Sequence, residues 1–392
     1  MHETAVAADD RESAWRAVFA ALGANFIGVG FARFAYTPLI PALVAAHWFS
    51  PASAAYLGAA NLAGYLAGAL GARALAARLG IAPAVRAMML TASLSFLACA
   101  LPLSFLWYFL WRFAAGIAGG VLMALAPSAA LQIVPPARRG LAGGVIFTGV
   151  GLGIAASGTL VPLLLERGLV AAWLGLGALS FAITAAAWSG WPRRTEPALS
   201  KPRHAGAPAG PIVALYLEYA LNAAGLVPHM IFLVDFVARG LHAGLAAGAR
   251  YWVVFGLGAM LGPLAAGRLA DRIGFRATLR VVFLVQTAAV GLLAASGSWA
   301  ALFLSSLLVG ALVPGVVPVV LGRVHELVPG PERQQQAWAR CAIAFAVGQA
   351  VAGYGFSYIF ARSGGAYELL FALGAGLIAA GLFVDLAAGR RR

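Results

Sequence analysis

Residues 300–322 read AALFLSSLLVGALVPGVVPVVLG and contain no charged side chain. As one helix, a run of this length crosses the roughly 30 Å hydrocarbon core of a bilayer at 1.5 Å per residue. The run is continuously apolar and does not alternate, which favours a helix over a barrel strand. With this one included, twelve such runs lie near residues 16–46, 53–77, 84–102, 105–133, 141–165, 169–190, 211–236, 247–269, 277–296, 300–327, 337–361 and 367–388. The sequence predicts an all-α membrane protein with twelve transmembrane helices.

The overall composition supports this prediction. Hydrophobic residues make up 62% of the 392 residues and charged residues only 10%, whereas soluble domains carry about 25% charged residues. The net charge of +14 does not indicate nucleic-acid binding, because basic residues recur in short loops between the apolar runs. Most of them fall in alternate loops, which predicts that both termini are cytoplasmic. The high Ala and Arg content suggests a GC-rich bacterial genome, and we expect the protein to lie in the bacterial inner membrane. Cys99 and Cys341 lie within apolar runs and are expected to be packing residues.

The chain also repeats itself. A polar stretch at 191–210, WPRRTEPALSKPRHAGAPAG, is expected to link two six-helix halves, residues 1–190 and 211–392. The motif Gly64-x-x-x-Gly68 in the first half recurs as Gly258-x-x-x-Gly262 in the second, at an offset of 194 residues. Because Gly-x-x-x-Gly lets helices approach closely, each half is predicted to form the same helix contact. The predicted architecture is therefore two pseudo-symmetric halves, a known plan for transporters.

Several motifs resemble those of a known family. The stretch Gly267-Arg-Leu-Ala-Asp271-Arg272-Ile-Gly274-Phe-Arg276 resembles the signature loop of the major facilitator superfamily, and Arg112-Phe-Ala-Ala-Gly116 resembles its second motif. Residues 28–38 and 64–68 are similar to the YbfB/YjiJ-type branch. Ala77 stands where the repeat places the signature Asp, and a Gly-Pro motif typical of drug antiporters is missing from the fifth helix. These two departures disfavour a drug antiporter.

The resemblance implies a mechanism. Two halves would rock about a central cavity lined by helices 1, 4, 7 and 10, and Asp271 would latch the inner side near Gly140. The residues assigned to gating are Gly267, Asp271, Arg272, Gly274, Arg276 and the i,i+3 pair Arg323 and Glu326. The alternative for the signature loop is that its basic residues only set the topology.

Ionisable residues inside the membrane are costly, so they mark candidate sites. Arg33 lies near mid-membrane and is expected to bind a substrate carboxylate, with Tyr36 one turn away. Alternatively, Arg33 bonds backbone carbonyls at a helix break near Pro38 and Pro41. Arg112 is assigned either to substrate binding or to a structural role against helix carbonyls.

The seventh predicted helix supplies the remaining candidates. Glu218 is the candidate proton carrier, and the alternative is a neutral acid bonded to Tyr219 or Asn222. His229 is the second candidate for proton coupling, and Asn222 and His229 are also assigned to substrate binding. Asp235 and Glu368 lie near helix ends and are expected to be solvated.

The sequence contains no H-E-x-x-H, G-x-S-x-G or Walker A motif, so we expect neither an enzyme nor a cofactor. The first hypothesis is a proton-coupled secondary transporter of a small anionic or zwitterionic organic solute. A second is proton-driven efflux of hydrophobic or cationic toxic compounds, and a third is a non-transporting sensor on the same fold. The expected partners are the solute, protons and lipid, without nucleic acid, and the protein is expected to be a monomer.

Overall fold

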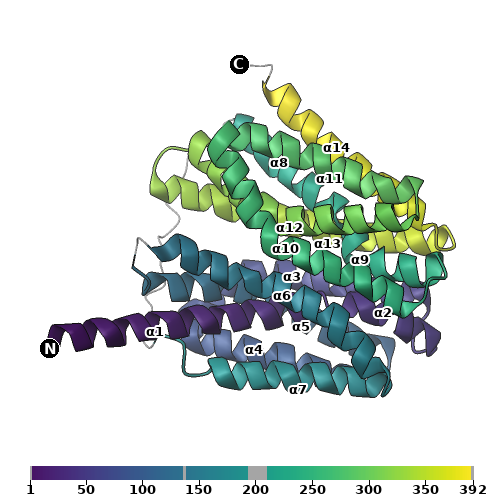
Figure 1. The fold of residues 1–392 in the computed structure, drawn as a ribbon, viewed down its shortest axis with the longest axis horizontal. Coiled ribbons are helices and arrows are strands. Elements are labelled where there is room, and N and C mark those ends of the chain that lie inside the picture. Colours follow the sequence, from purple (N-terminus) through teal and green to yellow (C-terminus); the bar gives the residue numbers. More distant parts are fainter. Residues whose placement is uncertain (1, 136–137, 193–209, 390–392) are drawn as a thin grey trace. The chain divides into compact units, whose positions relative to one another are not determined.

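The computed structural model describes residues 2–135, 138–192 and 210–389. Within these residues the regular structure is entirely helical, as Figure 1 shows. The described residues form twelve long helical rods in succession, which confirms the predicted fold class. Ten rods are single helices: α3 (Pro51–Leu79), α4 (Ile81–Cys99), α5 (Phe105–Gln132), α6 (Arg139–Leu165), α7 (Leu169–Ala187), α10 (Leu245–Ile273), α11 (Phe275–Ala295), α12 (Trp299–Leu327), α13 (Pro331–Arg362) and α14 (Tyr367–Gly389).

The first and seventh rods are each broken. The first consists of α1 (His2–Asn25), the π-helical η1 (Phe26–Phe31) and α2 (Tyr36–Ala45), with a turn at 32–35. The seventh consists of α8 (Gly210–Gly225), α9 (Val227–Asp235) and the π-helical η3 (Phe236–Gly240). Its interruption at Leu226 lies 194 residues after Ala32, so the two breaks occupy equivalent positions of the repeat. Pro228 is the second residue of α9, and a proline there cannot donate the hydrogen bond that would continue α8.

Eleven of the rods are long and apolar enough to cross a membrane. The other rod, α3, has 29 residues and is also long enough. Its polar Tyr56, Asn61 and Tyr65 lower its hydropathy. Because α3 is long enough and lies between spanning rods, we count it as the second spanning helix.

Contacts divide the chain into two compact units. The first comprises residues 1–36 and 64–199, and the second comprises 37–63 and 200–392. Residues 37–63, which are α2 and the beginning of α3, therefore pack with the second unit although they belong to the first half of the sequence. Of the predicted linker at 191–210, residues 193–209 lie outside the described part of the structure.

Specific contacts hold residues 37–63 in the second unit. The Thr37 hydroxyl donates to the Met230 carbonyl over 2.5 Å. Leu62 and Ala59 lie so close to Gly353 that a Cβ there would be 2.9 Å from Leu62 Cδ1. The rings of Tyr56 and Tyr354 are 6.3 Å apart. The segment thus contributes to the packing of α9 and α13.

The repeated glycine motif forms the same contact in both units. In the first unit, a Cβ on Gly64 or Gly68 of α3 would collide with the Phe113 or Ile117 carbonyl of α5. The obstacle in each case is backbone, which cannot rotate away. Only a residue without a Cβ allows two helix backbones to approach so closely.

In the second unit, Gly258 and Gly262 of α10 lie against the Leu307 and Ala311 carbonyls of α12. Each residue of this contact is offset by 194 from its counterpart in the first unit. The predicted repetition of the helix contact is therefore confirmed at the level of individual carbonyl groups.

Candidate functional site

The break in the first rod is held by Arg112. This side chain comes from α5, is only 2% exposed, and donates from Nη1 to the Ala32 carbonyl over 2.8 Å. Its guanidinium carbon also lies 4.3 Å from the centre of the Tyr36 ring. The turn at 32–35 interrupts the helical hydrogen bonds and leaves carbonyls that need donors. Arg112 supplies one, which is the structural role that the sequence offered as an alternative.

Arg33 lies in the same turn, with its guanidinium against aromatic rings. Its guanidinium carbon is 5.3 Å from the centre of the Tyr65 ring on α3 and 5.0 Å from that of Phe34. These distances fit cation–π contacts. Tyr36 is buried and packs against Trp173 of α7, with ring centres 6.4 Å apart. The first unit therefore gathers the predicted residues Arg33, Tyr36 and Arg112 around one helix break.

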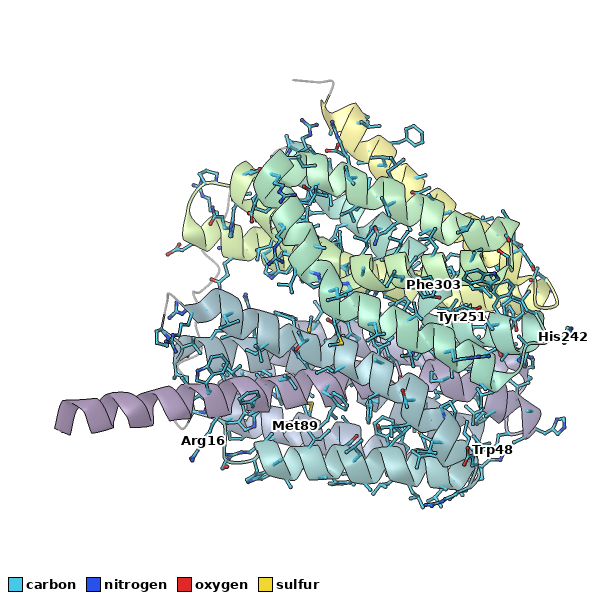
Figure 2. The ribbon with its side chains drawn as sticks, viewed as in Figure 1. Arg16, Trp48, Met89, His242, Tyr251 and Phe303 are labelled. Carbon is cyan, nitrogen blue, oxygen red and sulfur yellow. The ribbon has the colours of Figure 1, made fainter. Side chains whose placement is uncertain are left out.

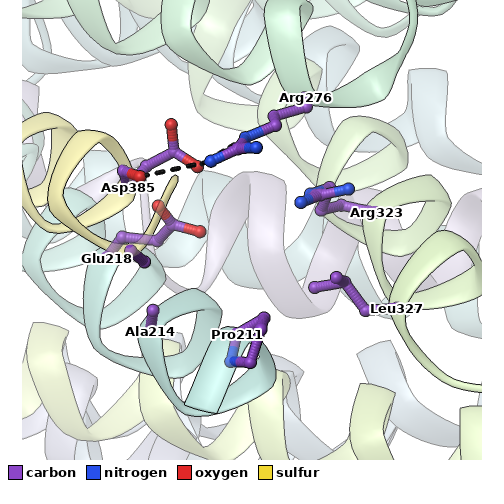
Figure 3. Close-up of a pocket in the computed structure, with 8 residues that line it drawn as sticks. Pro211, Ala214, Glu218, Arg276, Arg323, Leu327 and Asp385 are labelled. Atoms are coloured by element: carbon purple, nitrogen blue, oxygen red, sulfur yellow. Dashed lines mark hydrogen bonds and ion pairs between the residues drawn. The ribbon is translucent and has the colours of Figure 1, made fainter. Parts of the chain in front are cut away.

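In the second unit, Glu218 lines a small charged pocket, shown in Figure 3. The pocket has a volume of about 10 Å³, close to the minimum that holds one water molecule. Glu218 is 3% exposed, and its Oε2 has no hydrogen-bond partner among the described residues. The bonds to Tyr219 or Asn222 that were offered as an alternative are therefore not formed by this oxygen. The pocket is lined by Pro211, Ala214, Glu218, Arg276, Arg323, Leu327, Asp385 and Ala388.

The charges around Glu218 are paired with one another. Arg276 Nε lies 3.4 Å from Asp385 Oδ1, and Arg280 forms a short ion pair with the other oxygen of Asp385. Arg323 pairs with Glu326 over 2.6 Å, as their i,i+3 spacing predicts. Sequence reasoning missed Asp385, although an acid inside the apolar run 367–388 was a detectable signal.

Asn222, one turn beyond Glu218, bonds to a second amide. Its Nδ2 donates to Gln286 Oε1 of α11 over 2.6 Å, and both residues are completely buried. Asn222 Oδ1 and Gln286 Nε2 have no partner among the described residues. Gln286 was not identified from the sequence, because nothing local marks it as the partner of a residue on another helix.

His229 is held in a fixed hydrogen-bond chain. Its Nε2 lies 2.8 Å from Ser305 Oγ, and Ser305 donates to the Ala289 carbonyl over 2.6 Å. Ser305 has one hydroxyl hydrogen, so the Nε2–H of His229 is the donor to Ser305. The ring is fully buried and packs edge-on against Phe371, with centres 5.1 Å apart. These contacts link α9, α12, α11 and α14 around the imidazole.

The expectation that Asp235 is solvated is wrong. This carboxylate is 1% exposed, forms a 2.5 Å ion pair with Arg239, and accepts a 2.6 Å hydrogen bond from Tyr367. Tyr367 belongs to α14 and lies 132 residues away, so the sequence around Asp235 does not reveal this partner. The expectation that Glu368 is solvated is correct, since its side chain is exposed.

The signature stretch, expected to be a loop, is almost entirely helical: it forms the end of α10 and the beginning of α11. Gly274 alone separates the two helices, with φ of +82°, in the left-handed region that favours glycine. Asp271 and Arg272 are exposed, whereas Gly267 is half-buried with open space where a Cβ would lie. Of the predicted gating residues in this stretch, Arg276 is the one that lines the Glu218 pocket.

A larger hollow of about 500 Å³ lies on the second unit beside α10 and α12. Tyr251 and Phe303, labelled in Figure 2, belong to its lining. Arg250 is the one charged residue among those that line it. The rest of its lining is largely apolar, whereas the charged residues gather around the much smaller pocket at Glu218.

The fold and these buried charges define a polytopic secondary transporter, and comparison with known proteins gives its family. Residues 25–386 match the family described as "Uncharacterised MFS-type transporter YbfB", so the chain belongs to this family of the major facilitator superfamily. A search of curated proteins finds no match. Among solved structures, a mutant of the nucleoside transporter NupG is similar, with a TM-score of 0.75 and 12% identity. The match covers 96% of this chain and 99% of NupG, and at this identity it supports the fold alone.

Proposed function

We propose that this transporter moves a small anionic or zwitterionic organic solute across the bacterial inner membrane and is driven by protons. The two halves would alternate in exposing the site to either side, with both termini in the cytoplasm. NupG is a nucleoside transporter, but the shared fold at 12% identity gives no reason to assign nucleosides to this chain.

The observation that carries proton coupling is the buried carboxyl group of Glu218. Its Oε2 has no hydrogen-bond partner among the described residues, and it faces a pocket that also contains Arg276, Arg323 and Asp385. A carboxyl group is neutral when it carries a proton and anionic when it has released it. The neighbouring guanidinium groups can stabilise the anionic form, and the pocket has room for about one water molecule to transfer the proton.

Arg33 supports the choice of an anionic or zwitterionic solute. Arg112 already donates to the Ala32 carbonyl, so we assign it to holding the break. Arg33 lies in the same break against Tyr65 and Phe34, and a guanidinium group matches the geometry of a carboxylate. We therefore propose Arg33, with Tyr36, as the substrate-binding residues of the first unit.

Residues at the ends of helices are assigned to gating. The Arg323–Glu326 ion pair lies on α12 beside the Glu218 pocket, and Asp271 is exposed near the end of α10. In the proposed cycle, rocking of the halves makes and breaks contacts of these exposed groups. Proton loading at Glu218 changes the charge next to Arg323 and thereby links coupling to gating.

Substrate binding is tested first by thermal-shift measurements on the purified protein. The probes are a panel of carboxylates and amino acids, with cationic amphiphiles as the competing class. We expect carboxylate-bearing compounds to stabilise the wild type and the Arg167→Ala control, whose arginine is exposed in a loop, but not Arg33→Ala. Stabilisation by cationic amphiphiles alone would contradict the anionic substrate and favour efflux.

Proton coupling is tested with a stabilising compound in proteoliposomes under an imposed pH gradient. The wild type should accumulate the compound. Glu218→Gln should lose gradient-driven accumulation and retain exchange, and Glu368→Gln, which changes an exposed acid, should behave as the wild type. Undiminished accumulation by Glu218→Gln would refute the coupling role.

A further inference from the structure

The buried amide pair of Asn222 and Gln286 has unused hydrogen-bonding capacity. One bond, from Asn222 Nδ2 to Gln286 Oε1, joins the two side chains over 2.6 Å. The other atom of each amide, Asn222 Oδ1 and Gln286 Nε2, has no partner among the described residues. Buried polar atoms are almost always hydrogen-bonded, so both atoms are expected to gain partners in some state of the protein.

Glu218 lies where it can supply a partner. It precedes Asn222 by four residues on α8, so the two side chains are neighbours on one face of the helix. Side chains on a helix lean toward its N-terminus, which directs Asn222 over the turn that carries Glu218. Glu218 Oε2 is also buried without a partner among the described residues. The three atoms without a partner among the described residues thus belong to two residues one turn apart on α8 and to Gln286 on α11, which Asn222 contacts.

The chemistry of the three groups allows two arrangements. When Glu218 is protonated, its O–H donates to Asn222 Oδ1 while Asn222 Nδ2 donates to Gln286, which is the observed orientation of the amide pair. When Glu218 is ionised, its oxygens only accept, so Oδ1 facing the carboxylate would be repulsive. Rotation of both amides by half a turn then directs Asn222 Nδ2 to the carboxylate and lets Gln286 Nε2 donate to Asn222 Oδ1. Each arrangement contains two hydrogen bonds.

We infer that Asn222 and Gln286 form a two-state amide relay. The orientation of the two amides changes with the protonation of Glu218, so that the hydrogen bond between α8 and α11 differs in the two states. This inference rests on the proposed role of Glu218 as the proton carrier. It assigns Asn222 to positioning the proton site, in place of the direct substrate contact expected from the sequence. The relay joins two helices, so the protonation state of Glu218 determines which atoms connect them.

Other charged or titratable groups surround Glu218 and contribute to its titration. They are Arg276 and Arg280 on α11, Arg323 on α12, Cys341 on α13 and Asp385 on α14. None of these groups is altered by substitutions at Asn222 or Gln286. A change in titration caused by those substitutions therefore reports on the amide pair itself.

The test is a pH titration of the full-length protein in liposomes, followed by infrared difference spectroscopy. It uses protons as the probe and needs no substrate. The carboxylic C=O band that disappears in Glu218→Gln identifies protonated Glu218. In Asn222→Leu we expect this band to move to higher frequency, because its hydrogen bond is lost. The titration midpoint should rise by about one pH unit, a tenfold change in proton affinity, because the bond lost by the anion is charge-assisted and stronger.

Two further variants separate the relay from general disruption. In Gln286→Leu, Asn222 remains and can still rotate, so the midpoint should move by less than half as much as in Asn222→Leu. Asn25→Leu removes a buried asparagine of the first unit and should leave the midpoint unchanged. If Asn222→Leu does not fold, Asn222→Ala replaces it.

The outcomes also separate this inference from the proposed function. If Glu218→Gln removes no titrating band, Glu218 is not the proton carrier and the proposed function fails, together with the relay. If Glu218→Gln removes the band but Asn222→Leu and Asn222→Ala leave its frequency and midpoint unchanged, the relay alone is refuted. Equal midpoint shifts in the Asn222 and Gln286 variants would indicate a merely structural effect and would also refute it.

Discussion

Replacing Gly262 by alanine tests the repeated contact between α10 and α12. A Cβ at this position would overlap the Ala311 carbonyl and would lie 2.7 Å from Ala311 Cα. Ordinary van der Waals contact begins at about 3.4 Å. The obstacle is backbone on a neighbouring helix, so relief requires the two helices to separate by about 0.7 Å or more.

This separation weakens packing along the whole contact, which also includes Gly258 against Leu307 and Gly310 against Phe255. Overpacking of a close contact costs about 1–3 kcal/mol. Because a Cβ at Gly262 would meet a backbone carbonyl, we expect Gly262→Ala to lower the free energy of unfolding by an amount in the upper half of that range. Gly68→Ala, at the equivalent position of the first unit against Ile117, should cost a similar amount.

The assay is the free energy of unfolding in mixed detergent micelles, followed by tryptophan fluorescence. Gly376→Ala is the matched control, since nothing lies within 4 Å of a Cβ at that position of α14. It should unfold within about 1 kcal/mol of the wild type, because only helix propensity changes. If Gly262→Ala is as stable as Gly376→Ala, the close approach of α10 and α12 does not depend on the missing Cβ, and the reasoning fails.

Two further predictions concern buried polar contacts. Tyr367→Phe removes the hydrogen bond to Asp235 and should lower the free energy of unfolding by about 1–3 kcal/mol. The same unfolding assay measures this loss. An unchanged free energy of unfolding would show that Asp235 does not need this donor. Arg112→Leu removes the donor to the Ala32 carbonyl, so backbone amides of residues 26–36 should exchange hydrogen faster in mass-spectrometric measurements. Arg112→Lys keeps a donor at this position and should increase the exchange rate by less. Unchanged exchange in Arg112→Leu would mean that the turn is stable without the guanidinium group.

The helices and the glycine contacts could be predicted from the sequence, because both depend on local patterns. Lipid requires apolar runs of about 20 residues, and these are visible without any tertiary information. The offset of 194 residues between Gly68 and Gly262 also predicted a repeated contact, and the structure shows that these glycines meet the carbonyls of Ile117 and Ala311, which are offset by the same number. The Arg323–Glu326 pair was predictable for the same reason, since three residues separate its members on one helix.

The partners of the buried charges could not be predicted in this way. Asp385 pairs with Arg280 and Arg276 across 105 and 109 residues of sequence. Asp235 was expected to be solvated because it lies near a helix end, yet Tyr367 reaches it from α14. Depth along a helix can be estimated from a sequence, but the direction in which a side chain points depends on how the helices pack.

The packing of residues 37–63 with the second unit affects how the protein is made. Translation and membrane insertion proceed from the N-terminus, so this segment is synthesised more than a hundred residues before the helices on which it packs. Residues 37–63 contact Ile231, Gly353 and Tyr354 of the second unit. In a fragment that begins after the linker, these three residues would lose the contacts. Coexpressed halves, cut at the linker, therefore have to reassemble through an element that the first half contributes to the second.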